Sequence, residues 1–379
     1  MQADYAMQPA PRPLWKNRDY VLLWCGQTVS IIGTQVSSIA FPLLVLALTD
    51  SPIQAGLVAA SRTLPYLLFT LPAGALVDRW NRKAVMIACN VGSGLALASV
   101  AVSLLLGVTT VAQIAIVSFV EGTFSVFFSL AEAGALPQVV TKEQLGTAVA
   151  QNQIQYSIGG IIGPPLGGTL YSAAHLLPFA ADAGSYAVSG LSLVAVKSRL
   201  QSARDTVLRS LRAEIGEGLA WLWHHPLIRY MAFLTGGINI GTTGYVLVIV
   251  VLAKEQGASP ALTGAIFAVG GVVGALGAGI GAFIQRRFSF SQAIIGTTWY
   301  FALSYALYAV AGTPALLFGI VAFSLLFGPT YDIVQYTYRI AIIPDALQGR
   351  VNSVFRLISW GVRPLGFALI GVLLERAGG

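Results

Sequence analysis

The sequence predicts an all-α membrane protein, and its composition, the length of its apolar runs and the placement of its charges each indicate that class. Hydrophobic residues make up 56% of the 379 residues, charged residues only 10%, and the mean hydropathy is +0.74. A soluble domain carries about 25% charged residues, so this chain has too little polar surface to face water. Intrinsic disorder is excluded too, because it needs low hydrophobicity with high charge. The only two cysteines, Cys25 and Cys89, lie in apolar runs and imply no disulfide framework.

Eleven apolar stretches are long enough to cross a bilayer as helices, since about 20 residues span about 30 Å of hydrocarbon. Strands of a membrane barrel would be about half as long and would alternate in polarity. The segment before Tyr20 is polar and contains proline, so no cleaved signal peptide is expected. The predicted spans are 20–48, 51–77, 84–107, 109–131, 145–171, 176–196, 227–253, 259–284, 289–312, 314–338 and 351–374.

The basic residues are distributed unevenly between the two sides of this predicted membrane domain. Of the 22 Lys and Arg residues, 17 fall in the N-terminal tail and in the loops on the same side. Lys254 and Arg376 lie on the other side, and Arg62, Arg356 and Arg363 lie inside spans. Because Lys and Arg resist translocation, the rich side is expected to be cytoplasmic. The sequence therefore predicts a multi-pass protein of the plasma membrane with a cytoplasmic N-terminus, and the formal charge of +7 does not indicate nucleic-acid binding.

A long loop, 197–226, divides the chain into an N-terminal bundle of six spans, 1–196, and a C-terminal bundle of five spans, 227–379. Apolar residues recur in this loop at spacings of three and four, which is typical of an amphipathic helix lying on the membrane surface. The stripe consists of Leu208, Leu211, Ile215, Leu219 and Leu222.

The two halves share an internal repeat. Ser51-Pro52 with Gly56 recurs as Ser259-Pro260 with Gly264, at an offset of 208 residues. Two further short matches, at offsets of 207 and 199, relate 74–79 to 281–286 and 165–167 to 364–366. Repeated bundles are typical of secondary transporters, which bind their substrates near the membrane midplane between the repeats.

Two longer motifs carry a family resemblance. Residues 74–83 read GALVDRWNRK, and residues 159–168 read GGIIGPPLGG. With Asn17-Arg18-Asp19, Glu121-Gly122 and 178–182, they resemble the major facilitator superfamily, and within it the third drug–proton antiporter family of multidrug, macrolide and siderophore exporters. The resemblance implies two pseudo-symmetric six-helix bundles, with spans 1, 4, 7 and 10 lining a central cavity. Since the family has twelve helices, the twelfth is expected to be missing here.

Charged residues inside the membrane are costly and are therefore functional candidates. Glu121 lies near the middle of its span, where burial suits a proton carrier, and Asp332 lies in span 314–338. The sequence leaves open whether these carboxylates act in transport or belong to structural ion pairs, and Asp182 is interpreted as a helix cap. The predicted proton and substrate pathway consists of Glu121, Asp332, Arg62, Arg363, Tyr331 and Gln335, with the two arginines as counter-ions in an undetermined pairing.

The family motifs also predict moving parts. In the loop after span 2, Asp78 is expected to latch onto the helix N-terminus near Arg350, and Arg82 to reach Glu132. The glycines of span 5 are expected to pack on the glycines of span 8 at 270–277. The predicted gating loop consists of Gly74, Asp78, Arg79, Arg82 and Lys83, and the antiporter-type helix is marked by Gly159, Gly163, Pro164, Gly167 and Gly168.

These features predict a proton-coupled exporter of hydrophobic small molecules that works as a monomer in the lipid bilayer by alternating access. The sequence contains no phosphate-binding loop, nucleophilic triad or metal-ligand cluster, so no enzyme activity, cofactor or metal is expected. Two alternatives remain: a lipid or solute uptake facilitator of the same fold, and an inactive, truncated membrane scaffold.

Overall fold

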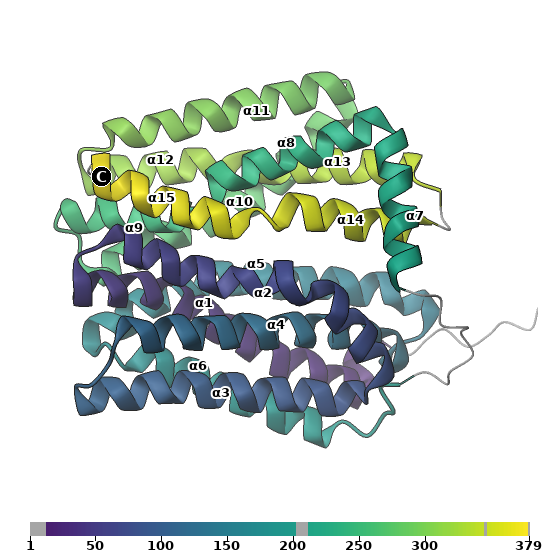
Figure 1. The fold of residues 1–379 in the computed structure, drawn as a ribbon, viewed down its shortest axis with the longest axis horizontal. Coiled ribbons are helices and arrows are strands. Elements are labelled where there is room, and N and C mark those ends of the chain that lie inside the picture. The colour runs from purple at the N-terminus through teal and green to yellow at the C-terminus, as the bar shows by residue number, and fades with distance from the viewer. Residues whose placement is uncertain (1–12, 202–210, 345–346, 378–379) are drawn as a thin grey trace, which may run out of the picture.

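In a computed structural model of the protein, residues 13–201, 211–344 and 347–377 are described, and all the regular structure in these ranges is helical (Figure 1). The predicted all-α class is confirmed. The N-terminal helices are α1 (Arg18–Thr49), α2 (Pro52–Arg79), α3 (Arg82–Leu106), α4 (Val111–Val139), α5 (Leu145–Ala173) and α6 (Leu177–Ala195).

Helix starts in this half follow from capping side chains. Asn17, Ser51, Asn81 and Thr110 each accept a hydrogen bond from a backbone N–H in the first turn of the helix that follows. The structure corrects the predicted end of span 109–131, because α4 continues to Val139 with Ala135 and Leu136 buried.

The C-terminal helices are more broken than the sequence predicts. They are α7 (Leu211–His224), α8 (Pro226–Thr243), α9 (Tyr245–Glu255), α10 (Pro260–Arg287), α11 (Phe290–Leu307), α12 (Pro314–Leu326), α13 (Gly328–Ile342), α14 (Gln348–Trp360) and α15 (Arg363–Ala377). Three spans that were predicted as continuous are each split, at Gly244, at Phe327 and at 361–362. Pro329 and Pro364 follow two of the breaks, and proline has no N–H to continue the hydrogen bonds of a helix.

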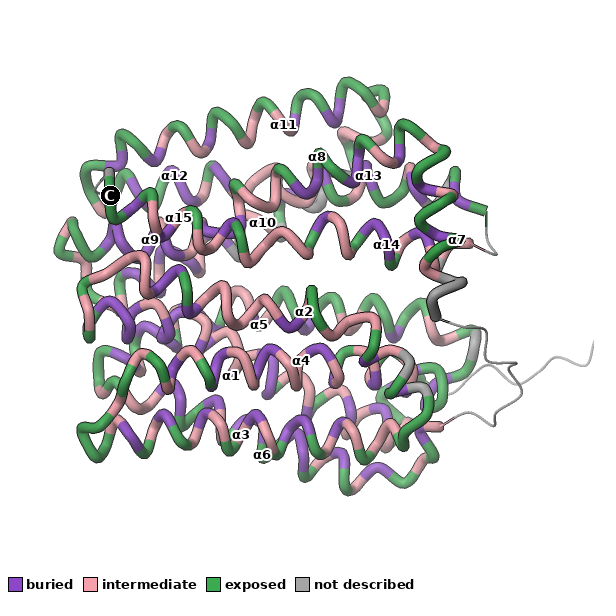
Figure 2. The backbone as a smooth tube through the Cα atoms, viewed as in Figure 1, coloured by how far each residue is buried: buried purple, intermediate pink, exposed green. Residues whose placement is uncertain are grey.

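Seven helical segments in the described part of the chain are long and apolar enough to cross a membrane. They are Arg18–Thr49, Arg82–Leu106, Val111–Val139, Pro226–Glu255, Phe290–Val310, Pro314–Arg339 and Arg350–Arg376. The other four predicted spans are also helices, namely α2, α5, α6 and α10, and their passage through a membrane stays a prediction. Large apolar side chains such as Leu95, Ile116, Leu191 and Trp299 are exposed, as expected for faces that contact lipid. Figure 2 shows exposed residues along α11 in green.

Helices α1–α6 pack on one another, and so do α8–α15; in Figure 1 the two groups lie one above the other. The groups meet where α2 contacts α15 and where α5 contacts α10. The repeated Ser-Pro-Gly motif forms both contacts. A Cβ on Gly56 would lie 2.6 Å from the Phe367 carbonyl of α15, and one on Gly264 would lie 2.5 Å from the Pro164 carbonyl of α5. Glycine at both positions therefore lets the backbones of the two groups approach closely.

Polar contacts also join the groups at the end of the molecule that carries α9. Lys254 Nζ donates to the Leu46 carbonyl at 3.0 Å and lies 2.6 Å from Asp50 Oδ1. Glu375 Oε2 accepts from Ser51 Oγ at 2.5 Å and from the backbone N–H of Ile53 at 3.0 Å. These bonds and the glycine contacts hold the two groups together at this end.

Helix α7 lies at the opposite end and packs on α14 and α8. Its predicted apolar stripe is divided: Leu222 is buried against Val351 and Phe355 of α14, whereas Leu219 is exposed. Glu217 pairs with Arg350 at 2.5 Å. Part of the stripe expected to face the membrane therefore packs against the protein, and Leu208 lies outside the described residues.

Candidate functional site

A buried ion pair joins α2 and α4 in the N-terminal group. Arg62 Nη2 lies 2.7 Å from Glu121 Oε1, and the Glu121 side chain is 2% exposed. The next residue, Gly122, faces the Arg62 backbone carbonyl, where a Cβ would clash. Glycine at position 122 therefore lets α4 approach α2 closely enough for Glu121 to reach Arg62. The sequence left the pairing of the interior charges open, and the structure resolves it for these two residues.

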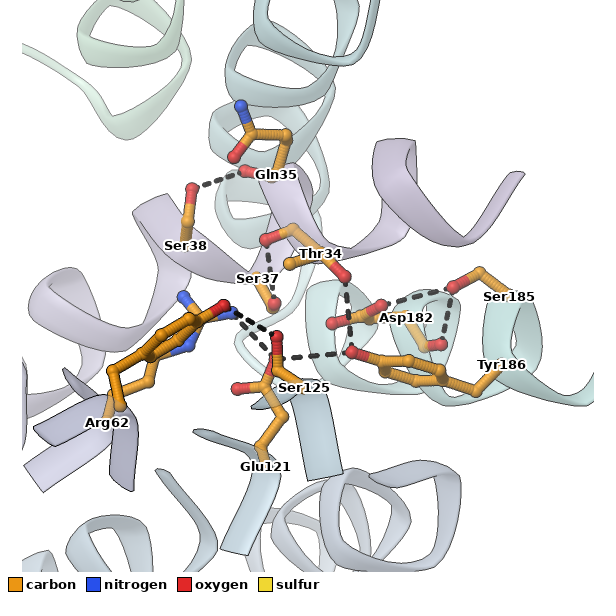
Figure 3. Close-up of polar contacts among 11 residues, drawn as sticks. Thr34, Gln35, Ser37, Ser38, Arg62, Glu121, Ser125, Asp182, Ser185 and Tyr186 are labelled. Carbon is orange, nitrogen blue, oxygen red and sulfur yellow. Dashed lines mark hydrogen bonds and ion pairs between the residues drawn. The ribbon is translucent and has the colours of Figure 1, made fainter. Parts of the chain in front are cut away.

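Helices α1 and α6 add polar groups to this pair (Figure 3). Tyr186 donates its hydroxyl hydrogen to Glu121 Oε1 at 3.3 Å, and its oxygen lies 3.2 Å from Thr34 Oγ1. One turn earlier in α6, Asp182 Oδ1 accepts a hydrogen bond from Ser185 Oγ at 3.1 Å. The buried cluster, as we call it below, consists of Arg62, Glu121, Asp182 and Tyr186.

Asp182 is not a helix cap, contrary to the prediction from the sequence. Helix α6 begins at Leu177, so Asp182 lies beyond its first turn and is 0% exposed. Gly33 of α1 makes this burial feasible, because a Cβ at that position would lie 2.6 Å from Asp182 Oδ1. The sequence contained the signal as a carboxylate six residues into an apolar helix, but the facing glycine could be found only in the structure.

A cavity of about 160 Å³ lies beside the buried cluster; its lining includes Tyr186 of the cluster and Thr34, whose hydroxyl contacts Tyr186. Its wall is mixed, with the rings of Phe124 and Phe128 next to hydroxyl and amide groups. The other lining residues are Gln27, Ser30, Ile31, Gln35, Cys89, Asn90, Ser93, Ser125 and Tyr156. Such a pocket has room for water or for a small part of a substrate.

In the C-terminal group, the predicted pathway residues lie on α13. Tyr331 is buried, and its hydroxyl lies 2.8 Å from Thr235 Oγ1 of α8. Gln335 is also buried, and its Oε1 atom has no hydrogen-bond partner. Asp332, between them in the sequence, is exposed. The structure thus places these three residues on one helix, and α13 contacts α10, α11 and α12.

Arginine side chains in this half stack on aromatic rings. Arg363 lies 5.0 Å from the Trp360 ring centroid, Arg356 lies 4.9 Å from the same ring, and the Arg363 Nε atom is buried without a hydrogen-bond partner. The predicted position of Arg339, in the cytoplasmic loop after span 314–338, is wrong. Arg339 lies in the last turn of α13, is 5% exposed, and its guanidinium lies 3.8 Å from the ring centroid of Phe355 of α14.

The predicted gating loop is held by the N-terminal group. Arg82 Nη1 donates to the Gly134 carbonyl of α4 at 2.8 Å, two residues after Glu132, and the predicted contact of Arg82 with Glu132 stays a prediction. Lys83 Nζ donates to the Val196 carbonyl, just after α6, at 2.6 Å. Gly74 and Arg79 lie in the last two turns of α2. Asp78 lies there too, but its side chain is outside the described part of the structure.

The predicted packing of the α5 glycines on the glycines of α10 is wrong in part. Helix α5 contacts α10, but a Cβ on Gly159 or Gly167 would instead meet Ile31 or Val36 of α1, and Gly163 faces Gln35. Only Gly168 of this set faces α10, at Pro260 and Gly264. Gly270 and Gly277 face α12. The predicted glycine-on-glycine contact is therefore limited to the end near α9, because the stripe is rotated towards α1.

Comparisons with known proteins agree with this fold. The family model described as Major Facilitator Superfamily matches residues 23–367. Over 369 residues the chain is 29% identical to the multidrug efflux pump Tap of Mycolicibacterium fortuitum, covering 91% of this chain and 87% of the relative. It is 26% identical to the enterobactin exporter EntS of Citrobacter koseri, covering 93% and 84%. The crystal structure of the nucleoside transporter NupG superposes with a TM-score of 0.76 at 14% identity, covering 96% and 92%.

Proposed function

This chain belongs to the major facilitator superfamily and is a membrane transporter rather than an enzyme, and we propose that it exports hydrophobic small molecules in exchange for protons. The substrates would be of the drug, macrolide or siderophore kind. Two relatives named for multidrug efflux and for enterobactin export support the outward direction. The span-5 motif of antiporters, 159–168, supports it independently.

The buried ion pair between Arg62 and Glu121 is the observation that carries the proposal. A carboxylate in the membrane interior is stable only with a cation or a proton. Glu121 has the cation in this structure, and protonation would release Arg62 from it. Exchange between these two states would couple proton movement to the packing of α2 against α4, and hence to the shape of the neighbouring cavity.

The proposed architecture has two pseudo-symmetric bundles, 1–196 and 227–379, joined by the linker 197–226, with eleven spans in the chain. Support comes from the two contacts between the groups. The repeat relates span 2 to span 8 and span 5 to span 11, so it also relates the contact of α2 with α15 to that of α10 with α5. The two halves would rock about these contacts as a monomer within the bilayer.

With the side rich in Lys and Arg assigned to the cytoplasm, the α9 end faces outward and is closed in this structure. Export then requires the Lys254 and Glu375 contacts to break and the cytoplasmic end to close. The proposed latch for that closure is the loop at 74–83, with Asp78 acting on the α14 N-terminus. Asp332, Tyr331, Gln335 and Arg363 are proposed to line the substrate pathway from the C-terminal side, and Gly159, Gly163, Pro164, Gly167 and Gly168 to guide the movement of α5.

The test is efflux of a hydrophobic fluorescent dye from cells that produce the wild type, Glu121→Gln or the control Glu255→Gln, which neutralises an exposed carboxylate at the end of α9. We expect a protonophore to stop efflux by the wild type and by the control. Glu121→Gln should insert normally but lose the gradient-driven efflux.

Efflux by Glu121→Gln at the wild-type rate would remove Glu121 from coupling. Wild-type efflux that ignores the protonophore would contradict proton exchange altogether. Net accumulation of the dye would favour the uptake facilitator, the alternative from the same fold.

A further inference from the structure

The buried cluster contains two carboxyl groups and one cation, and this imbalance points to a bound proton. We propose that Asp182 of α6, rather than Glu121, holds that proton in the state described by the structure. The inference rests on the proposed function and identifies where the exchanged proton resides while Glu121 is paired with Arg62. The step is simple protonation: a proton from water forms an O–H bond with the Asp182 carboxylate, and the charge of the group falls to zero.

The two carboxyl groups have different surroundings. Glu121 Oε1 receives the Arg62 guanidinium at 2.7 Å and the Tyr186 hydroxyl at 3.3 Å. Asp182 has only hydroxyl groups in direct contact: Ser185 donates to its Oδ1 atom, Ser37 of α1 lies beside it, and its Oδ2 atom is buried without a hydrogen-bond partner. Glu121 Oε2 is also buried without a partner, but its carboxylate has the cation. The charged form therefore suits Glu121, and the neutral form suits Asp182.

The helices around Asp182 offer no second cation. From α2 and α4, the charged groups that face it are Arg62 and Glu121, and Tyr186 faces it from α6 itself. Helices α1, α3 and α5 also pack on α6. The sequences of α1 and α3 carry charges only in their first turns, at 18–19 and 82–83, and α5 has no Asp, Glu, Lys or Arg residue. Two ionised carboxylates would therefore share Arg62, and one proton removes that repulsion.

The structure also provides a place for the proton and a route to it. Gly33 keeps a side chain away from Asp182 Oδ1, since a Cβ there would lie 2.6 Å from this atom. The polar cavity reaches the cluster through Thr34 and Tyr186. Only a hydroxyl group would then separate water in the cavity from the carboxyl groups. A proton could pass along this route while α6 stays packed against α3.

The test is infrared difference spectroscopy of the purified protein in detergent, taken from neutral to alkaline pH. A protonated buried carboxyl group gives a carbonyl stretching band that disappears when the proton leaves. Protein from cells supplied with aspartate that carries ¹³C in its side-chain carboxyl group should show this band at a lower frequency. The band should be lost in Asp182→Asn and should remain, still shifted by the label, in the control Asp50→Asn, which neutralises an aspartate whose side chain is 87% exposed at the end of α1.

A band that the aspartate label does not move would place the proton on a glutamate and overturn the inference. Because this measurement uses the wild type, it does not depend on the folding of a variant. It also requires no transport. If the aspartate band is present but efflux does not depend on the proton gradient, the inference about Asp182 stands and only the proposed function is contradicted.

Discussion

The two halves of this transporter handle their interior charges differently. In the N-terminal group, Arg62 of α2 and Glu121 of α4 form a close ion pair. The other two members of the buried cluster, Asp182 and Tyr186, lie one turn apart in α6. In the C-terminal group, Arg339, Arg356 and Arg363 lie against aromatic rings. Arg62 also lies 5.8 Å from the Phe41 ring centroid, but it has a carboxylate partner, whereas the three arginines of the second half contact ring faces.

This difference suggests a division of work between the halves. A paired carboxylate changes its partner when it binds a proton, so the N-terminal half is suited to ion exchange. Arginines on aromatic faces leave N–H groups without hydrogen bonds: Nε of Arg339 and of Arg363 is buried without a partner, and a substrate would reach it only after a movement of α13 or α15. Such groups are suited to contacts with polar atoms of a substrate.

The largest expected effect concerns the ion pair. Arg62→Met leaves buried carboxylates without their cation and should lower the free energy of unfolding by about 3–5 kcal/mol. The double variant Arg62→Met/Glu121→Leu should recover most of this loss, because it removes both charges. Arg363→Met, which removes a stacked cation of the other half, should cost less. Thermal unfolding in detergent measures all three, and equal losses in the single and double variants would show that the pair is not coupled.

The second prediction compares the halves at their contacts. Gly264→Ala and Gly56→Ala should each cost about 1–3 kcal/mol through overpacking, offset by up to about 1 kcal/mol from better helix propensity. Gly241→Ala of α8 is the matched control, because its Cβ would meet nothing within 4 Å, and it should be neutral or stabilising. The same unfolding measurement applies. If Gly264→Ala and Gly56→Ala differ strongly, the two contacts are not equivalent.

The smallest effect is expected at the α9 end. The side chains of Lys254 and Asp50 are 47% and 87% exposed, so Lys254→Ala should change the stability by about 0–1 kcal/mol. High salt should reduce even this difference, since exposed pairs are screened. A loss larger than that of Gly264→Ala would mean that polar bonds, rather than backbone packing, close this end.

Much of this structure was predictable one segment at a time. All eleven predicted stretches are helical, three of them as two helices each, and the repeat marked Gly56 and Gly264, which lie at corresponding contacts between the groups. Glu121 and Arg62 were recognised as interior charges from their positions alone. Some errors concern location, such as the end of α4 and the position of Arg339. Others concern direction: Asp182 is buried instead of capping α6, and Gly159, Gly163 and Gly167 face α1 instead of α10.

The sequence by itself determined the membrane class, the family, the helix positions and the uneven distribution of charge, because composition, run length and motifs are local properties. Only the tertiary structure decided that Arg62 meets Glu121, that Gly33 leaves room for Asp182, and that Arg339 stacks on Phe355 of α14. Successive residues of a helix point about 100° apart, so a small rotation or shift of one helix changes every partner of its side chains. That rotation is set by the packing of all the neighbouring helices together, which no single segment of the sequence contains.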